Sequence, residues 1–402
     1  IAGRVQPPDG NHLEESGGDG GMKWEIAKLG KIAIIRTGKL DSNAAVIGGR
    51  YPFFTCDPNT LSIDVWAYDT EAVLLAGNNA SGNYTAKYYK GKFNAYQRTY
   101  IIESTNEEKL NIRYLCYALN QRLQLLKTMS SGSTTKFLTV RMLDNLDIPL
   151  PGINIQNQIV NILSAYDDLI ENNRKQIKLL EEAAQRLYKE WFVDLRFPGH
   201  ENTKIVDGVP EGWSIYPFSS KVDIMSGGTP KTSIPDYYNG KIPFYTPKDN
   251  DGAFFAYKTQ MNITEGGLKN CNSRLYPPKT VIITARGTVG KTTILAVPMA
   301  MNQSCYALKM KENDAPYYLF FALNNEIKAL QTMANGGVFN TIIGKTFDSI
   351  NIQIPKDPLI YGFEETVRPF MEQIKNKLQA NSKIVEARDR LLPKLMSGEV
   401  EV

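Results

Sequence analysis

The sequence predicts an α+β protein in which two globular domains of mixed helix and strand alternate with two long helices. Two observations predict this fold. The first is a run of apolar residues at alternating steps of four and three, from Gln156 to Phe192, without proline or glycine. The second is an internal repeat, because a shift of 204 residues superimposes this run on another, from Pro358 to Met396.

The first long helix has one continuous apolar face. Its members fall on one side of an α-helix: Ile159, Leu163, Tyr166, Ile170, Ile177, Leu180, Ala184, Leu187 and Trp191, with Asn173 in the one gap. A period of 3.5 residues over several heptads is typical of a coiled coil. The helix would be roughly 55 Å long, as expected of a spacer. Charged residues interrupt the run, which excludes a membrane span.

The second long helix supplies the partner within the same chain. Its apolar face repeats the spacing at Phe363, Val367, Phe370, Ile374, Ile384, Leu391 and Leu395. Antiparallel pairing about a pseudo-twofold axis would place Asn173 opposite Asn381, and a polar pair in an apolar seam can fix its register. Asn173 could instead be a solvated gap, and Lys377 and Arg388 also interrupt the second seam.

Composition shifts divide the chain. Residues 1–21 are rich in Gly, Asp and Glu and have little to bury, so we expect a disordered leader, with Met22 as the natural start. The segment Asp194–Gly199 ends the first helix with proline and glycine. The expected parts are a first domain over 22–155, a central helix over 156–196, a second domain over 197–357 and a C-terminal helix over 358–402.

Within the first domain the sequence predicts several short elements. We expect buried strands at Lys31–Arg36 and Ala72–Ala76, a helix over Tyr114–Thr128, and a polar loop over Gly77–Gln97. The second domain repeats this order: Ile242–Thr246 matches Tyr51–Thr55, Val281–Ile283 matches Val73–Leu75, and Tyr318–Asn324 matches Tyr114–Asn120. Most of the remaining sequence differs, so one architecture would carry two different surfaces.

Charge and cysteine usage constrain function only broadly. The net charge of +4 permits a polyanionic partner without requiring one. The four cysteines stand far apart without a CxxC pair, and there are only two histidines. We therefore expect neither a zinc site nor a disulfide framework, and a reducing cytoplasm fits best. No signal peptide or hydrophobic span is present, and no cofactor is predicted.

The segment Ala285–Thr292 follows an apolar strand and has three interpretations. A nucleotide-binding P-loop needs glycine where Ala285 stands, and the matching segment Gly77–Tyr84 lacks the lysine. The segment could instead be a glycine-permitted tight loop that presents Arg286 and Lys291 to a phosphodiester chain. A purely structural turn is the third possibility.

Basic, aromatic and amide side chains gather in both domains, and these are the types that bind phosphates and base edges. In the first domain they are Tyr84, Lys87, Tyr88, Tyr89, Lys90, Lys92, Gln97 and Arg98. In the second they are Lys231, Tyr245, Lys248, Arg286, Lys291, Asn302 and Gln303. For any one residue a solvated surface is the simpler interpretation, but the group indicates nucleic acid.

No catalytic constellation stands out. An amino-methyltransferase would need an Asn or Asp followed by Pro-Pro and an aromatic residue, and the nearest strings, Cys56–Asn59 and Tyr276–Lys279, do not match. A metal-dependent nuclease would need clustered acids with a nearby lysine, which Asp236 lacks. With two histidines, no nucleophile–base system is apparent either. The sequence therefore predicts a protein that is not an enzyme.

The ordered, duplicated arrangement resembles the specificity subunit of bacterial type I restriction-modification enzymes. The resemblance covers Met22 to Val402 and is carried by four segments of the long helices: Gln158–Leu163, Glu190–Phe192, Arg390–Leu392 and Leu395–Gly398. It implies two target-recognition domains that each read half of a split site in double-stranded DNA, without catalysis. It also implies two modification subunits, docked on the helices, which carry the methyltransferase and bind S-adenosylmethionine. ATP-driven restriction subunits would join that core, and no membrane is involved.

Because the two domains differ, the resemblance implies a bipartite, asymmetric target with an unread spacer. Two readers on one side of the duplex would stand about one helical turn apart, roughly 34 Å. Three other functions stay open from the sequence. They are a P-loop ATPase or nuclease, a coiled-coil scaffold for protein interactions, and a recognition subunit of another class of modification system.

Overall fold

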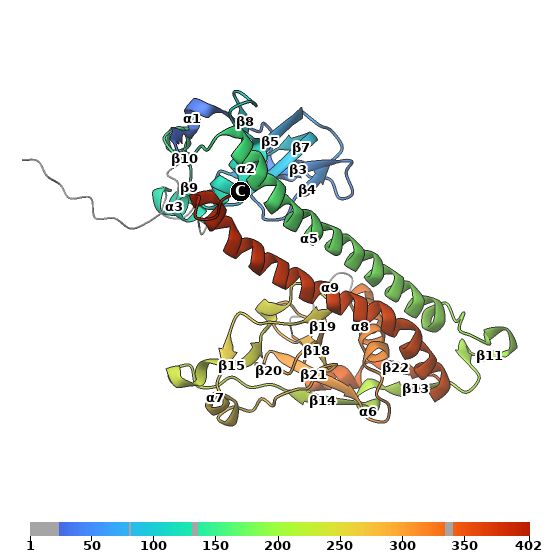
Figure 1. Ribbon diagram of the computed structural model, residues 1–402. Coiled ribbons are helices and arrows are strands. Elements are labelled where there is room, and N and C mark those ends of the chain that lie inside the picture. The colour runs from blue at the N-terminus through green and yellow to red at the C-terminus, as the bar shows by residue number, and fades with distance from the viewer. Residues whose placement is uncertain (1–23, 80–81, 131–135, 334–340) are drawn as a thin grey trace, which may run out of the picture. The chain divides into compact units, whose positions relative to one another are not determined.

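The computed structural model describes residues 24–79, 82–130, 136–333 and 341–402, so the expected leader and Met22 lie outside the described residues. The chain forms two compact units. Unit 1 runs to Asp168 and resumes at Ile384, and unit 2 is Leu169–Lys383. The two long helices, α5 (Ile153–Tyr188) and α9 (Asp357–Ser397), each contribute to both units (Figure 1).

Unit 1 is built on a six-stranded sheet in the order β2-β8-β5-β7-β3-β4, in which only β3 and β7 run parallel. Its strands are β2 (Ala33–Thr37), β3 (Tyr51–Phe54), β4 (Leu61–Ile63), β5 (Tyr68–Ala76), β7 (Ala86–Ala95) and β8 (Thr99–Ser104). Two small pairs join β1 (Ile26–Lys28) to β10 (Asp147–Pro149) and β6 (Asn78–Asn79) to β9 (Lys136–Phe137). The short helices are α1 (Leu29–Ile32), the 3-10 turn η1 (Ser42–Ala44), α2 (Ile112–Asn120), α3 (Leu123–Met129) and α4 (Val140–Asp144).

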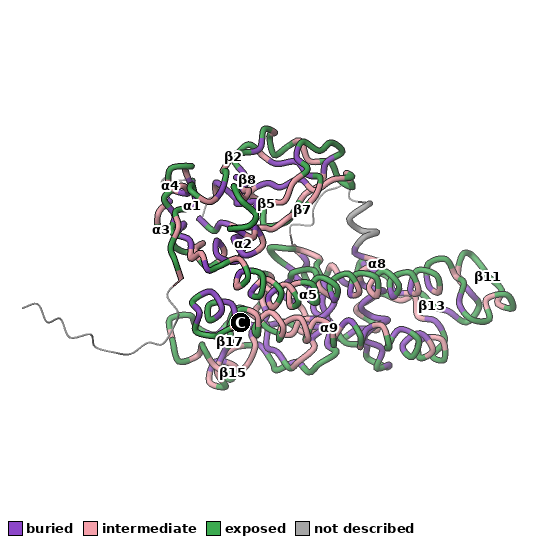
Figure 2. Tube along the Cα trace, turned by 45° about the horizontal axis from the view of Figure 1, so that its top comes forward, coloured by how far each residue is buried: buried purple, intermediate pink, exposed green. Residues whose placement is uncertain are grey.

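The core of unit 1 lies between this sheet and α2, which packs on β5 and β7. Helix α2 begins where the Asn111 side chain accepts the backbone N–H groups of Arg113 and Tyr114. Buried residues follow the central strands and α2 (Figure 2). The long helices join the same core through Ile159 and Leu163 of α5 and through Leu392, Leu395 and Met396 of α9.

Polar contacts also hold α2 and the long helices together within unit 1. Asp167 of α5 accepts the Tyr117 hydroxyl of α2 and lies 2.7 Å from Nη1 of Arg388 on α9. The neighbouring Asp168 receives a hydrogen bond of 2.9 Å from Arg113. Arg388 is therefore a seam residue that is paired with a carboxylate rather than solvated.

Three expectations for the first domain need correction. The strand expected from Lys31 begins only at Ala33, because α1 precedes it. The single helix expected over Tyr114–Thr128 is two helices, α2 and α3, separated at Gln121 and Arg122. The loop expected over Gly77–Gln97 is wrong, because the segment contains the ten-residue strand β7 and the short strand β6.

Strand β7 is stabilised by neighbours that are distant in sequence. Lys90 forms a 2.8 Å ion pair with Glu71 on β5, and the Tyr89 ring packs 5.3 Å from Phe54 on β3. These partners supply the cross-strand contacts that its lysine- and glycine-containing sequence does not signal.

Unit 2 repeats the strand arrangement of unit 1 with more inserted segments. A five-stranded sheet has the order β14-β21-β18-β19-β16 and a three-stranded sheet the order β17-β15-β20. The strands are β14 (Val222–Ser226), β15 (Tyr238–Tyr245), β16 (Phe255–Ala256), β17 (Asn262–Ile263), β18 (Val281–Thr284), β19 (Thr292–Leu295), β20 (Ala300–Met301) and β21 (Cys305–Met310), with the pairs β11 (Ile205–Val206) and β12 (Val209–Pro210), β13 (Ser214–Pro217) and β22 (Asn351–Ile354). The helices are α6 (Phe218–Lys221), α7 (Glu265–Lys269) and α8 (Pro316–Met333), with the 3-10 turns η3 (His200–Asn202), η4 (Pro235–Tyr237), η5 (Pro247–Asp249) and η6 (Gly344–Asp348).

The internal repeat is confirmed strand by strand. The pairs β2–β8, β5–β8, β5–β7 and β1–β10 of unit 1 correspond to β14–β21, β18–β21, β18–β19 and β13–β22 of unit 2. Even the parallel pair recurs, since Phe53 and Phe54 lie beside Asn94 and Ala95, and Phe244 and Tyr245 lie beside Ala300 and Met301.

In unit 2 the helices α5 and α9 pair in the antiparallel sense that the sequence predicts. The rings of Trp191 and Phe363 lie 5.9 Å apart, and Nδ2 of Asn173 donates to Oδ1 of Asn381 over 2.9 Å. Between these two contacts each helix advances by 18 residues in opposite directions. The predicted asparagine pair is therefore confirmed. Helix α5 ends in a π-helical turn, η2 (Lys189–Val193).

Glu364 of α9 is a buried charge that caps α8. It is 4% exposed, and its Oε1 accepts the backbone N–H of Tyr318 over 2.7 Å. Burial raises the pKa of this carboxyl to about 7, although the hydrogen bonds from the helix backbone act in the opposite direction. No helix in the described part of the chain, α5 and α9 included, combines the length and apolarity needed to cross a bilayer.

Candidate nucleic-acid interface

A tight turn between β7 and β8 forms the centre of the candidate interface in unit 1. We call Tyr96–Thr99 turn 1. Thr99 N–H donates to the Tyr96 carbonyl over 2.8 Å and closes the turn. Tyr96 N–H donates to Phe54 and Gly77 N–H donates to Arg98, so two further segments hold the turn in place. Gln97 and Arg98 at its corner are both exposed.

Unit 2 builds the same turn at Asn302–Cys305, which we call turn 2. Cys305 N–H donates to Asn302, Asn302 N–H donates to Tyr245, and Ala285 N–H donates to Ser304. These bonds repeat those of turn 1 one for one. The corner residues here are Gln303, which is exposed, and Ser304, which is half-buried. One scaffold therefore presents Gln-Arg in unit 1 and Gln-Ser in unit 2.

The glycine-rich segment of unit 2 is a hairpin loop beside turn 2. Gly287 and Gly290 have φ of +78° and +82°, the region that favours glycine, and β19 follows directly. A P-loop would lead into a helix, so the P-loop interpretation is wrong. The loop is the glycine-permitted tight turn, and it exposes Arg286 and Lys291.

Hydrogen bonds join this hairpin and turn 2 to two further segments. The Thr288 hydroxyl lies 3.4 Å from the Pro247 carbonyl at the start of η5, which carries Lys248. The Thr229 hydroxyl donates to Oε1 of Gln303, which connects turn 2 to the segment that carries Lys231. We define the loop cluster of unit 2 as 227–231, 245–250, 285–291 and 302–305.

The loop cluster of unit 2 exposes four cations. Lys231, Lys248, Arg286 and Lys291 are all exposed, and no carboxylate of the described residues lies within 4.0 Å of them. Unpaired cations around an exposed amide can bind a phosphate backbone and place the amide against base edges. Asn302 contributes less, because its Oδ1 already accepts the backbone N–H of Ser304.

In unit 1 the candidates differ in what they already bind. Arg98 has no carboxylate within 4.0 Å among the described residues, whereas Nε2 of Gln97 donates to Asp41 over 2.6 Å. Nζ of Lys87 is 3.1 Å from the Asp57 carbonyl, and burial lowers its pKa. Lys87 therefore supports the loop after β3. Nζ of Lys92 is exposed and lies 4.7 Å above the Trp66 ring.

Glu71 binds two further candidates on β7. The Tyr88 hydroxyl donates to Glu71 over 3.0 Å, and burial raises the pKa of Tyr88 to about 12. The ion pair with Glu71 also raises the pKa of Lys90. Tyr89 packs against β3, so the β7 aromatics help to fix the strand. Of the candidate cations of unit 1, Arg98 and Lys92 are the two that are exposed and have no carboxylate within 4.0 Å among the described residues.

The model of the type I restriction modification DNA specificity domain matches residues 22–182 and 210–380, which fall on the two repeats. The chain belongs to this family. It is 26% identical to the EcoDI specificity subunit of Escherichia coli over 94% of this chain and 89% of that one. It is 29% identical to the MjaIX specificity subunit of Methanocaldococcus jannaschii over 72% of this chain and 69% of that one.

A solved structure shows the same fold as this specificity-family chain. The S subunit of a type I restriction-modification system from M. genitalium superimposes with a TM-score of 0.62, at 17% identity, over 96% of this chain and 98% of that one. At that identity the likeness concerns the fold alone.

Two predicted contact residues of this specificity-family chain are core residues. Tyr84 is 4% exposed and Tyr245 is fully buried, and their hydroxyls have no hydrogen-bond partner among the described residues. They pack in the cores of their units and cannot reach a surface ligand. Sequence reasoning also missed Thr229 and Thr288, which join the loops of unit 2, since such contacts between distant residues leave no local signal. The described residues contain no cluster of His, Cys, Asp and Glu that could hold a metal.

Proposed function

We propose that this chain is the DNA-recognition subunit of a type I restriction-modification complex, and that it reads a bipartite, asymmetric target. Unit 1 reads one half and unit 2 the other. The observation that carries the proposal is the pair of equivalent turns with different corner residues. Arginine pairs with guanine and glutamine with adenine in the major groove. Glutamine stands at both corners, so the arginine of turn 1, Arg98, in place of Ser304 in turn 2 is the difference that would select a different half-site.

Cations outside the turns position the protein on the duplex. Lys92 of β7 serves unit 1, and the four cations of the unit 2 loop cluster serve unit 2. Such contacts supply affinity and register without reading sequence.

Helices α5 and α9 dock the modification subunits, two in number because the architecture is duplicated, and restriction subunits join that core. Exposed apolar side chains support such docking. Leu169 and Leu179 on α5 are 47% and 64% exposed, and Tyr361 on α9 is 48% exposed. The chain recognises DNA in the cytoplasm without catalysing the modification, and it needs no cofactor of its own.

Mapping of methylated bases tests this function. The chain is co-expressed with its modification subunits, and the methylated motif is read from the host genome. We expect one motif with two unlike parts and a gap of constant length. The double variant Gln97→Ala/Arg98→Ala should relax only one part and Gln303→Ala only the other. Arg141→Ala, an exposed cation on α4, is the matched control and should change neither.

Three results would contradict the proposal. A continuous or palindromic motif would remove the two-half model. Relaxation of both parts by one variant would show that the turns do not act separately. An absence of methylation, with the complex assembled, would favour a scaffold role.

A further inference from the structure

The corner glutamines of turn 1 and turn 2 have different polar neighbours. Nε2 of Gln97 donates to Oδ1 of Asp41 over 2.6 Å. In unit 2 the Thr229 hydroxyl donates to Oε1 of Gln303 instead. Within the part of the chain that the structure describes, neither glutamine side chain makes another hydrogen bond. Each exposed glutamine therefore has one end of its amide occupied and the other end available to a ligand.

The two polar neighbours stand at equivalent places in the repeat. The backbone N–H of Leu40 donates to the Ala95 carbonyl over 3.5 Å, and that of Gly228 donates to the Met301 carbonyl over 3.1 Å. Ala95 and Met301 are themselves equivalent, because each lies in the parallel strand pair of its unit. In both units the next residue along the chain carries the side chain that contacts the glutamine. The repeat thus builds one contact twice, with a carboxylate in unit 1 and a hydroxyl in unit 2.

The backbone holds both neighbours close to their turns. Gly38 and Gly227 precede them, and a side chain at either glycine would collide with the carbonyl group of Tyr96 or Asn302. Asp41 stands at the N-cap position of η1, but its side chain makes no capping hydrogen bond there. Its carboxylate therefore serves turn 1 rather than the short helix that follows it.

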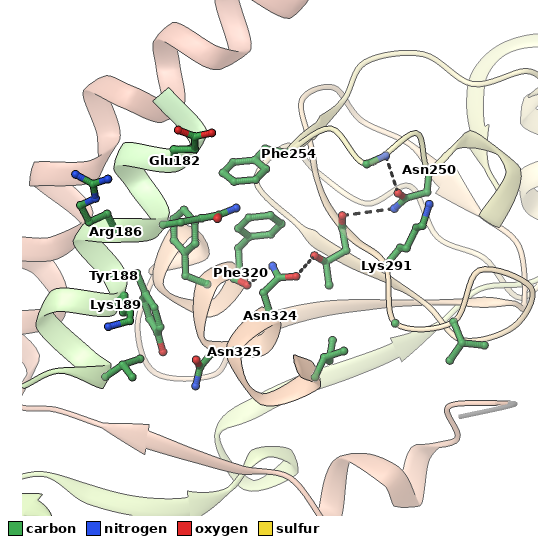
Figure 3. Close-up of a pocket in the computed structure, with 18 residues that line it drawn as sticks. Glu182, Arg186, Tyr188, Lys189, Asn250, Phe254, Lys291, Phe320, Asn324 and Asn325 are labelled. Carbon is green, nitrogen blue, oxygen red and sulfur yellow. Dashed lines mark hydrogen bonds between the residues drawn. The ribbon is translucent and has the colours of Figure 1, made fainter. Parts of the chain in front are cut away.

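Turn 2 is also anchored to the interior of unit 2. The Asn302 N–H donates to the Tyr245 carbonyl, which places the turn on the segment 245–250. At the other end of that segment, Asn250 donates to the Thr292 carbonyl over 3.4 Å, and the Thr292 hydroxyl donates to Asn324 of α8 over 2.8 Å (Figure 3). A recognition side chain on such a fixed support can be oriented by a single neighbour.

The two neighbours leave opposite hydrogen-bonding groups of the glutamines free. A carboxylate has no proton to donate, so Asp41 faces Nε2 of Gln97 and leaves Oε1 and one N–H for a ligand. The Thr229 hydroxyl occupies Oε1 of Gln303 and leaves both N–H groups of Nε2. In the major groove adenine offers one donor and one acceptor, whereas guanine offers two acceptors. The first amide therefore matches adenine and the second matches guanine.

We propose that Asp41 and Thr229 are positioning residues for DNA recognition, which make Gln97 select an A·T pair and Gln303 a G·C pair. The inference rests on the proposed function and extends it. It adds a second difference between the half-sites to the arginine–serine difference at the corners. Identical glutamines read different bases because their neighbours differ.

Mapping of the methylated motif tests this inference in the complex with the modification subunits. Gln97→Ala and Gln303→Ala each mark the position that one glutamine reads, and we expect A·T at the first and G·C at the second. Asp41→Ala should lower the preference for A·T at the first position about tenfold or more, and should add nothing when Gln97 is already alanine. Thr229→Asp should shift the second position from G·C toward A·T, which a purely structural role would not do.

Two matched controls separate position from charge. Thr232→Asp adds the same charge three residues after Thr229, and Glu108→Ala removes an exposed carboxylate from unit 1. Both side chains are exposed, and neither has a hydrogen bond to turn 1 or turn 2 in the described ranges. Neither variant should change the motif. Methylation that keeps the other positions of the motif shows that a variant folds and assembles.

The outcomes distinguish this inference from the proposed function. The inference alone is overturned if the motif has two unlike parts but the marked positions are not A·T and G·C. It is also overturned if Asp41→Ala and Thr229→Asp leave their base pairs unchanged, or if Thr232→Asp shifts the second position as much as Thr229→Asp. A motif without two unlike parts would overturn the proposed function, and this inference with it.

Discussion

The asparagine pair in the seam of α5 and α9 yields a quantitative prediction. Asn173 is 7% exposed, and its amide donates to Asn381 over 2.9 Å. Nδ2 of Asn381 is also 3.4 Å from the Ile170 carbonyl. Replacing one asparagine with leucine removes the bond and leaves the other amide facing an apolar side chain. Replacing both restores the apolar seam that the heptad pattern otherwise has.

The expected magnitudes follow from these contacts. A neutral hydrogen bond contributes about 1 kcal/mol, and a buried amide left without its partner costs about 1–3 kcal/mol. Asn173→Leu should therefore destabilise the helix pair by about 1–3 kcal/mol, and Asn381→Leu by a similar amount. The double variant should lie within about 1 kcal/mol of the unsubstituted protein, because two leucines pack where two amides bonded. Because the two single losses sum to about 2–6 kcal/mol and the double variant loses almost nothing, the pair would show a coupling energy of about 2–6 kcal/mol.

Native-state hydrogen exchange of α5 and α9 peptides measures these energies locally, which avoids treating a chain of two units as a single two-state system. Asn172→Leu is the control, because Asn172 is the exposed neighbour and should change stability by less than about 0.5 kcal/mol. A double variant that loses the sum of the two single losses would refute the reasoning, since the asparagines would then act independently.

Three further predictions follow from single contacts. Arg286→Ala and Lys291→Ala should each weaken duplex binding and reduce the salt dependence of the affinity by about one unit, and an unchanged salt slope would remove them from the interface. Glu364 has a pKa of about 7, above its ordinary value of 4.5, so the folded state binds the extra proton. The stabilisation that Glu364 contributes to the folded state is full below pH 4.5 and is lost as pH rises through 7. Hydrogen exchange of α8 should therefore show that Glu364→Gln gains about 3 kcal/mol relative to the unsubstituted protein between those limits, whereas a constant difference would contradict it. Asp167→Asn should lower the stability of unit 1 by about 1–2 kcal/mol in thermal denaturation, since Arg388 loses its partner across the seam, and no loss would show a solvated pair.

The long helices, the repeat and the asparagine pair could be read from the sequence because their signals are periodic. A 3.5-residue spacing marks the seam wherever it occurs, and a shift of 204 residues needs no knowledge of the fold. Antiparallel pairing of the two long helices then places Asn173 against Asn381. The sequence also predicts a tight turn within Ala285–Thr292, because glycine favours positive φ, and Gly287 and Gly290 adopt it.

Tertiary structure decided which of the predicted contact residues are exposed. Tyr84 and Tyr245 match the pattern of a nucleic-acid-binding loop as well as Lys92 does, yet both are buried, because exposure depends on neighbours far away in the chain. The sequence of β7 is typical of a loop, and the strand forms because Glu71 and Phe54, which are distant in sequence, contact it from the neighbouring strands. Periodicity along a chain thus determines which helices form and pair, whereas long-range packing alone decides which side chains remain free to meet a ligand.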